Sequence, residues 1–361
     1  MLLAARADAL TLYASTAAGT TGELYILDSA TGAVVQDVGP LNDLNNVNYP
    51  ITGLAFQPHT GILLGATGNS VAGTAAMLVK INPVTAQVLV IGSFNAGPVN
   101  ASGTPATMAD IAFDSAGILY GVGSIGGPSL YTINTSTGQA TPVGSTGLTS
   151  TTGGGLAINS TGTFFGTPTS SRFGTYDSTT GAYTNIANPE KPAGTGAYTA
   201  LDFNGSVLYG LNTGPGSPPP THLVTIDPAT GAVTDLGASL NSLDAIAFQP
   251  PPLLAGDYNN NHVIDAGDYV VYRNSEGTTN VLPNDAIGGT IGPAQYTQWR
   301  SNFGKPPGSG VSVSSIPEPS GAVLILVGVL AIWPYRRATA GYMHRKYHPS
   351  IVVHVAITGL H

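Results

Sequence analysis

The chain contains no cysteine among its 361 residues. Disulfide bonds, thiol nucleophiles and zinc sites built on cysteine ligands are therefore all excluded. This absence does not by itself assign the protein to a cellular compartment.

Charged residues are also scarce, at 8% of the chain, and their balance is acidic. Eleven Lys and Arg stand against 19 Asp and Glu, which gives a formal net charge of −8. Between residues 8 and 315 there are 18 acidic and 6 basic side chains. A protein that binds nucleic acid needs a basic face to neutralise phosphates, so this composition argues against that class of partner.

Good helix formers such as Glu and Lys are rare, whereas the chain holds 48 Gly and 27 Pro and is rich in Thr, Ser and Asn. Turn formers together with β-branched residues predict an all-β fold of many short strands. The 42% hydrophobic content is enough to build a packed core.

The N-terminus, MLLAARADA, combines a short apolar run with an Ala-Arg-Ala cleavage-like motif at residues 5–7. We interpret residues 1–8 as the remnant of a secretory signal peptide whose start lies further upstream. An ordinary mature N-terminus is the alternative.

Four strand-like segments recur five times between residues 9 and 250. Each is short, apolar or alternating, and bounded by turn residues, which is typical of β-strands. The first type reads GLAFQ (53–57), DIAFD (110–114), GLAIN (155–159), ALDFN (200–204) and AIAFQ (245–249). The third type reads ELYILDSATG (23–32), MLVKINPVTA (77–86), SLYTINTSTG (129–138), RFGTYDSTTG (172–181) and HLVTIDPATG (222–231).

The order of the segments predicts how the repeat domain closes. The chain begins with the second, third and fourth types and ends with an unaccompanied first type at residues 245–249. Five complete sets exist only if this last segment joins the first three, which predicts a ring closed by its own ends. We therefore expect a five-bladed β-propeller over residues 9–250, with four strands in each blade. A β-sandwich or an open solenoid would not explain the permuted ends.

An Asx-x-x-Thr-Gly element ends most copies of the third type. Asp or Asn can bond its own backbone two residues on, and Gly adopts positive φ without strain, so we interpret the element as a hairpin turn rather than a metal site. It occurs at residues 28–32, 134–138, 177–181 and 227–231, and at 82–86 with Ala in place of Gly.

Three carboxylates, Asp110, Asp202 and Asp244, lie in or just before first-type segments, which line the central channel of a propeller. They are candidates for a channel ligand or metal. A hydrolase would need two of them facing each other across a substrate. Their offsets from the repeating Phe differ, so at most two point the same way. The repeat region also lacks a Gly-x-Ser-x-Gly nucleophile motif, and we therefore expect no enzymatic activity.

The composition changes after residue 255, where a loop of residues 257–268 places oxygen ligands at alternate positions. A hard cation such as Ca²⁺ is bound in this way, with one ligand being a backbone carbonyl. The expected ligands are Asp257, Asn259, Asn261, Val263, Asp265 and Asp268. An Asn-rich turn without metal is the alternative. His262 stands where such loops usually have Gly, which should weaken the affinity.

This loop and the helix expected after it resemble a dockerin type I repeat, and the resemblance covers residues 256–305. A second copy follows 27 residues later, with Asn284 aligned to Asp257 and Gln295 aligned to Asp268. The second loop has lost its carboxylates, so we expect one Ca²⁺ site. The resemblance implies a cohesin-like protein partner.

The C-terminal region begins with a Gly/Pro/Ser linker at residues 306–315. Residues 316–338 then contain Pro317-Glu318-Pro319, an apolar run at 321–333, and the pair Arg336 and Arg337. They resemble a PEP-CTERM sorting signal, which implies a C-terminal membrane helix, cleavage by an exosortase-type enzyme, and release to the cell surface or extracellular matrix. Thirteen helical residues span ~20 Å, less than a ~30 Å bilayer core, so we expect only transient membrane anchoring. The tail at 339–361 departs from the family pattern.

Three classes of function remain open. The favoured one is a non-catalytic surface or matrix protein whose propeller binds a glycan, an extracellular polysaccharide or a protein. The second is a carbohydrate-active enzyme attached to a scaffold. The third is a purely structural matrix component.

Overall fold

A computed structural model describes most of the chain up to residue 305. The described residues are 10–17, 21–58, 60–68, 73–94, 107–123, 129–149, 154–251, 254–261 and 263–305. The proposed signal remnant, the linker, the sorting signal and the tail all lie outside these ranges, as does His262.

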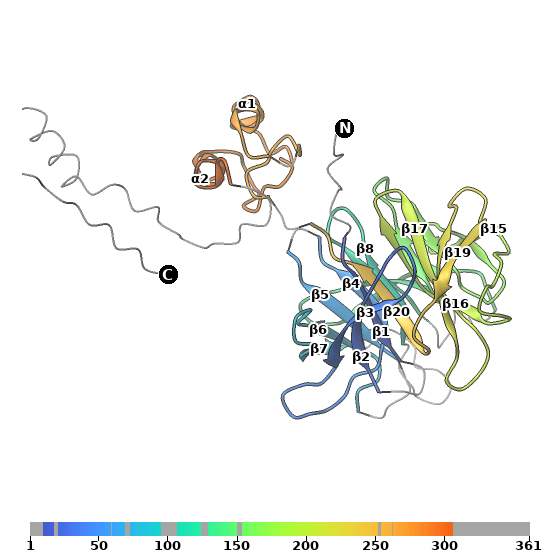
Figure 1. The fold of residues 1–361 in the computed structure, drawn as a ribbon. Helices are drawn as coiled ribbons and strands as arrows, with labels where there is room; N and C mark the ends of the chain where they lie inside the picture. Colours follow the sequence, from blue (N-terminus) through green and yellow to red (C-terminus); the bar gives the residue numbers. More distant parts are fainter. Residues whose placement is uncertain are drawn as a thin grey trace, which may run out of the picture. The chain divides into compact units, whose positions relative to one another are not determined.

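The described strands form five antiparallel sheets of four strands each (Figure 1). Blade 1 contains β20 (Leu243–Phe248), β1 (Leu12–Thr16), β2 (Glu23–Leu27) and β3 (Val34–Pro40). Blade 2 contains β4 (Ile51–Phe56), β5 (Leu63–Thr67), β6 (Met77–Ile81) and β7 (Val88–Ser93). Blade 3 contains β8 (Met108–Phe113), β9 (Leu119–Gly123), β10 (Ser129–Ile133) and β11 (Ala140–Ser145). Blade 4 contains β12 (Leu156–Ile158), β13 (Phe164–Gly166), β14 (Phe173–Tyr176) and β15 (Tyr183–Ala187). Blade 5 contains β16 (Ala197–Asn204), β17 (Val207–Thr213), β18 (Thr221–Ile226) and β19 (Val233–Ala238).

The two ends of the repeat region meet in blade 1. Strand β20 pairs with β1 in a register that runs from Leu12 opposite Phe248 to Ser15 opposite Ala245. The innermost strands β4, β8, β12, β16 and β20 contact one another in a ring. The predicted five-bladed architecture closed by its own ends is therefore confirmed, and both the sandwich and the solenoid are wrong.

The hydrophobic core lies between the blades. Each of five clusters of buried side chains is shared by two neighbouring sheets. The cluster that joins blades 5 and 1, for example, contains Leu211 and Leu223 together with Leu12 and Leu27. Burying one leucine stabilises the fold by roughly 2 kcal/mol. Apolar residues on both faces of each inner strand thus hold the ring together.

The Asx-x-x-Thr-Gly elements are hairpin turns between the third and fourth strands, as predicted. In blade 4, Asp177 Oδ1 accepts the backbone N–H groups of Thr179 at 2.8 Å and Thr180 at 2.9 Å. The hydrogen bond from the Thr179 hydroxyl, followed by these two backbone bonds, lowers the pKa of Asp177 to about 2. Gly181 has φ +76°, and a Cβ there would lie 2.4 Å from the carbonyl oxygen of Gly144 in blade 3. The turn is therefore also a contact between blades.

Residues 254–305 form two loop–helix units, each ending in a ten-residue helix. Helix α1 spans Ala266–Ser275 and α2 spans Pro293–Asn302, so both predicted helices are present. The units bond each other reciprocally: Gly304 donates its N–H to the carbonyl of Ile264, and Gly277 donates to that of Ile291, both at 2.9 Å. Gly277 and Gly304 are 27 residues apart, and so are Ile264 and Ile291. This spacing is the period of the internal repeat.

Candidate functional site

Asp110 lies at the centre of the propeller and is completely buried. Its Oδ1 accepts the N–H of Ile111 at 2.9 Å, and its Oδ2 accepts those of Leu156 at 2.9 Å and Leu201 at 3.2 Å. These donors belong to inner strands of three blades, whose inward edges have no further strand to pair with. Burial raises the pKa of Asp110 well above its usual range, although the three N–H groups lower it. Asp110 therefore joins three blades by satisfying their free backbone donors.

Asp202 on β16 does the same between blades 5 and 1. Its Oδ1 accepts the N–H of Phe203 at 2.8 Å, and its Oδ2 accepts that of Phe248 at 2.6 Å. Burial raises the pKa of Asp202 to about 7, against the effect of these two bonds. Asp244 is half-buried on β20.

The inner ring has little room beside Asp110. A Cβ on Gly53 would lie 2.8 Å from Asp110 Cα and 3.0 Å from its Oδ1. A Cβ on Gly155 would lie 2.7 Å from the Leu201 side chain. The first residue of each first-type segment is therefore Gly or Ala, except for Asp110. This pattern of small residues indicates a crowded axis, and our sequence reasoning missed it. The carboxylates of Asp110 and Asp202 both accept backbone N–H groups of inner strands.

In the loop at 257–268, both Asp257 and Asp268 are completely buried. Asp257 Oδ1 accepts the N–H of Asn261 at 3.1 Å. Asp268 accepts the N–H groups of Asn259 at 3.0 Å and Asp265 at 2.8 Å. Burial raises the pKa of Asp268, and the charges of Asp257 and Asp265 raise it further. One short loop therefore contains three carboxylates, and the charges of two of them act on the third.

Within the described ranges, no group of three or more His, Cys, Asp or Glu side chains is arranged to hold a metal ion. The carboxylates of the 257–268 loop instead turn toward backbone N–H groups. The predicted ligands Asn259, Asn261 and Val263 are exposed in the same loop. The donor set still suits Ca²⁺, because all of its members are oxygen ligands.

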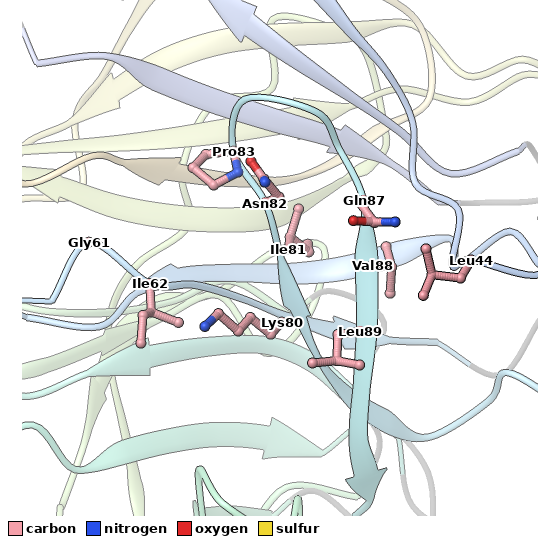
Figure 2. A pocket seen from close by; sticks show the side chains of 10 residues that line it. All are labelled: Leu44, Gly61, Ile62, Lys80, Ile81, Asn82, Pro83, Gln87, Val88 and Leu89. Carbon is pink, nitrogen blue, oxygen red and sulfur yellow. The ribbon is translucent and has the colours of Figure 1, made fainter.

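A pocket of about 500 Å³ lies at the outer part of blade 2 (Figure 2). Its lining is mostly apolar, with Lys80 as the basic member. Across β6 and β7, Lys80 stands opposite Leu89. The corresponding pairs in blades 3, 4 and 5 are Thr132–Thr141, Thr175–Thr184 and Thr225–Thr234. The lining residues are Leu44, Gly61, Ile62, Lys80, Ile81, Asn82, Pro83, Gln87, Val88 and Leu89.

This volume is within the range of small-molecule sites. Our sequence reasoning missed this pocket on blade 2. Blades 3, 4 and 5 have a Thr pair at this position, whereas blade 1 has Ile26 opposite Gln36 and blade 2 has Lys80 opposite Leu89. The Lys80–Leu89 pair was the signal that could have revealed the pocket.

The residues of the sorting motif, Pro317, Glu318, Pro319, Arg336 and Arg337, lie outside the described part of the chain. Among the described residues, no helix is long and apolar enough to cross a membrane. The apolar run at 321–333 falls beyond that part, so the expectation of a membrane helix stays a prediction.

No family model and no curated protein matches the chain. Among solved structures, it is similar to a structural-genomics protein of unknown function from Bacteroides thetaiotaomicron VPI-5482, at 12% identity and a TM-score of 0.37. That match covers 64% of this chain and 65% of the other, just under two thirds of its length. A protein of unknown function from Bacteroides caccae is similar at 12% identity and a TM-score of 0.36, over 66% of this chain and 98% of the other. The fold described above rests on the strand pairing of this chain, not on these likenesses.

Proposed function

We propose that the chain is an exported, non-catalytic binding protein, with a rigid propeller as its binding module and a second module that takes one Ca²⁺. The observation that carries this proposal is the bonding of Asp110 and Asp202, whose oxygens accept backbone N–H groups of the inner strands. A glycoside hydrolase needs two carboxyl groups facing a substrate, and these two are committed to holding the ring. Binding is therefore favoured over bond cleavage.

The pocket on blade 2 supports the binding role of the propeller. It offers an apolar wall and one lysine on a chain whose net charge is −8. Concave, mostly apolar sites with a few polar groups are the common form of a ligand site. The ligand proposed from the sequence is a glycan, an extracellular polysaccharide or a protein.

The calcium proposal rests on the donors of the 257–268 loop. Asp257, Asn259, Asn261, Asp265 and Asp268 would hold the ion, together with the carbonyl of Val263. When bound, Ca²⁺ would supply positive charge that offsets the repulsion among the three carboxylates. The dockerin resemblance extends this proposal to a cohesin-like protein partner, whose binding in a pull-down should be lost in a chelator.

Calcium should stabilise the 254–305 module. At 100 times its dissociation constant, we expect an increase of about 2.7 kcal/mol in the free energy of unfolding of the module. Trp299 is a suitable reporter, because its indole N–H donates to the carbonyl of Asp265 at 2.8 Å. The chain has two Trp residues, so Trp333→Phe in the full chain leaves Trp299 as the only one. Its fluorescence then follows thermal unfolding with and without calcium.

Asp268→Asn should abolish the calcium effect, because it removes a charged ligand. Asp227→Asn is the matched control, since Asp227 lies in a propeller turn, where it accepts the backbone N–H groups of Ala229 and Thr230. Titration calorimetry that detects no heat at millimolar calcium, with no change in the Trp299 transition, would refute the calcium site.

Export is proposed from the sequence alone. In native cells, we expect the mature chain to end near Pro317–Pro319 and to lack residues 321–361, because an exosortase-type enzyme removes the signal. Intact-mass measurement of the chain from the cell-surface fraction checks this. Replacing Pro317, Glu318 and Pro319 together with Ala should leave the tail uncut at the membrane. An uncut wild-type chain recovered from the cytosol would contradict the proposal and leave the calcium site unaffected.

A further inference from the structure

The second loop of the module, residues 284–295, is closed by one amide side chain. Gln295 is 1% exposed. Its Nε2 donates to Asp285 Oδ2 at 3.2 Å and to the carbonyl of Gly288 at 3.1 Å. Its Oε1 accepts the N–H of Gly292, the residue before α2, at 2.9 Å. One buried amide thus ties together the beginning, middle and end of the loop.

Gln295 occupies the position that Asp268 occupies in the first loop. Both side chains accept an N–H from the residue just before their helix, Gly292 for Gln295 and Asp265 for Asp268. The difference lies in the remaining group. Asp268 has a second anionic oxygen, which accepts the N–H of Asn259 while its charge is repelled by Asp257 and Asp265. Gln295 has an NH₂ group instead, which binds oxygen atoms directly. A bound cation would supply positive charge to the first loop. In the second loop, the two N–H donors of the Gln295 side chain take its place.

We propose that Gln295 is a built-in substitute for a metal ion, which keeps the second loop closed without calcium and positions the first loop to receive it. The second half of this inference rests on the calcium site proposed above. The first half does not, since it concerns only the closure of the second loop.

The contacts between the two loops provide the route for this positioning. Asn284, at the start of the second loop, donates its Nδ2 to the carbonyl of Asp257 at 2.9 Å. Tyr258 donates its hydroxyl to the carbonyl of Gln295 at 2.6 Å. The reciprocal bonds of Ile264 and Ile291 complete the connection. Asp257, the first ligand of the calcium loop, is therefore bonded by Asn284, the neighbour of Asp285, and Tyr258 is bonded to the backbone of Gln295 itself.

The decisive test exchanges donor and acceptor. Gln295→Glu keeps the shape and the bond from Gly292, but it turns an acceptor toward Asp285 and the Gly288 carbonyl. Two donated hydrogen bonds are lost, so we expect the calcium-free module to unfold at a clearly lower temperature. We expect the calcium dissociation constant to rise roughly tenfold, the effect of about one net hydrogen bond transmitted to the first loop. Adding Asp285→Asn to the Gln295→Glu variant restores a donor–acceptor pair of opposite direction. We expect this double variant to recover much of both losses.

All variants are made in the full chain that carries Trp333→Phe. For each, the melting temperature is measured from Trp299 fluorescence and the calcium dissociation constant from titration calorimetry. Thr297→Ala, an exposed position on α2, is the control for general weakening of the helix. Recovery in the double variant and one calcium ion per chain throughout would support the proposal. A Gln295→Glu chain with unchanged calcium-free melting, or a double variant no better than the single one, would overturn it. If Gln295→Glu lowers the melting temperature but the unsubstituted loops bind no calcium, the closure of the second loop by Gln295 stands and the calcium site is refuted.

Discussion

Replacing Asp110 with Ala should lower the free energy of unfolding of the propeller by about 3–5 kcal/mol. The substitution leaves the N–H groups of Ile111, Leu156 and Leu201 without their acceptor in the interior. Each unsatisfied buried donor costs about 1–3 kcal/mol, and the lost side chain also leaves a cavity. Because the three donors come from three blades, the loss should affect the ring as a whole. Urea unfolding followed by tyrosine fluorescence measures it.

Two variants calibrate this effect. Asp110→Asn keeps the volume but offers one acceptor oxygen instead of two, so its loss should be intermediate. Asp114→Ala is the matched control in the same hairpin, because the half-buried Asp114 also accepts two backbone N–H groups. Its loss should be about 1 kcal/mol, since water can replace it. Equal losses for Asp110→Ala and Asp114→Ala would refute the structural role of the buried carboxylate.

The propeller should lose about 2 kcal/mol of stability between pH 5 and pH 8. Burial raises the pKa of Asp202 to about 7, whereas an Asp in the unfolded chain titrates near ~4. Between these values the folded chain retains a proton that the unfolded chain has released. The stabilisation is therefore fully present below the unfolded pKa and is lost as the pH rises through the folded pKa. Two pH units correspond to about 2.7 kcal/mol, which partial exposure of Asp202 reduces.

Chemical unfolding at a series of pH values checks this slope. Asp110 contributes in the same direction, because its pKa is also raised. Asp202→Asn should flatten the curve while costing one hydrogen bond at every pH. Asp177→Asn should keep the slope, because the pKa of Asp177 lies near 2 and the group does not titrate in this range. Stability that is constant or increases from pH 5 to pH 8 would contradict the prediction.

The propeller could be predicted because its evidence is local and repeated. Each strand is apolar over a few residues, each turn has its Asp or Asn, and the unaccompanied segment at 245–249 indicates how the ring closes. The role of Asp110 could not be predicted in this way. Its partners Leu156 and Leu201 lie 46 and 91 residues away, and nothing near Asp110 in the sequence marks them.

The same distinction between local patterns and distant contacts applies to the helical module at residues 254–305. Alternate oxygen ligands at 257–268 are a local pattern and predict a cation loop. The amide bridge of Gln295 could not be predicted, because its partner Asp285 is not at a ligand position of the repeat. In the sequence, the second loop only lacks the carboxylate that Asp268 gives the first loop. In the structure, the amide of Gln295 closes the second loop in its place.

The pairing of β20 with β1 has a consequence for how the chain is made. Phe248 is opposite Leu12, a separation of 236 residues, so blade 1 stays incomplete until nearly the whole repeat region has left the ribosome. Contacts between such distant parts of a chain form slowly. Until then the open side of β1 can pair with strands of other molecules. Assembly of the ring is therefore governed by its last strand, and a chain truncated before residue 243 would be prone to aggregate.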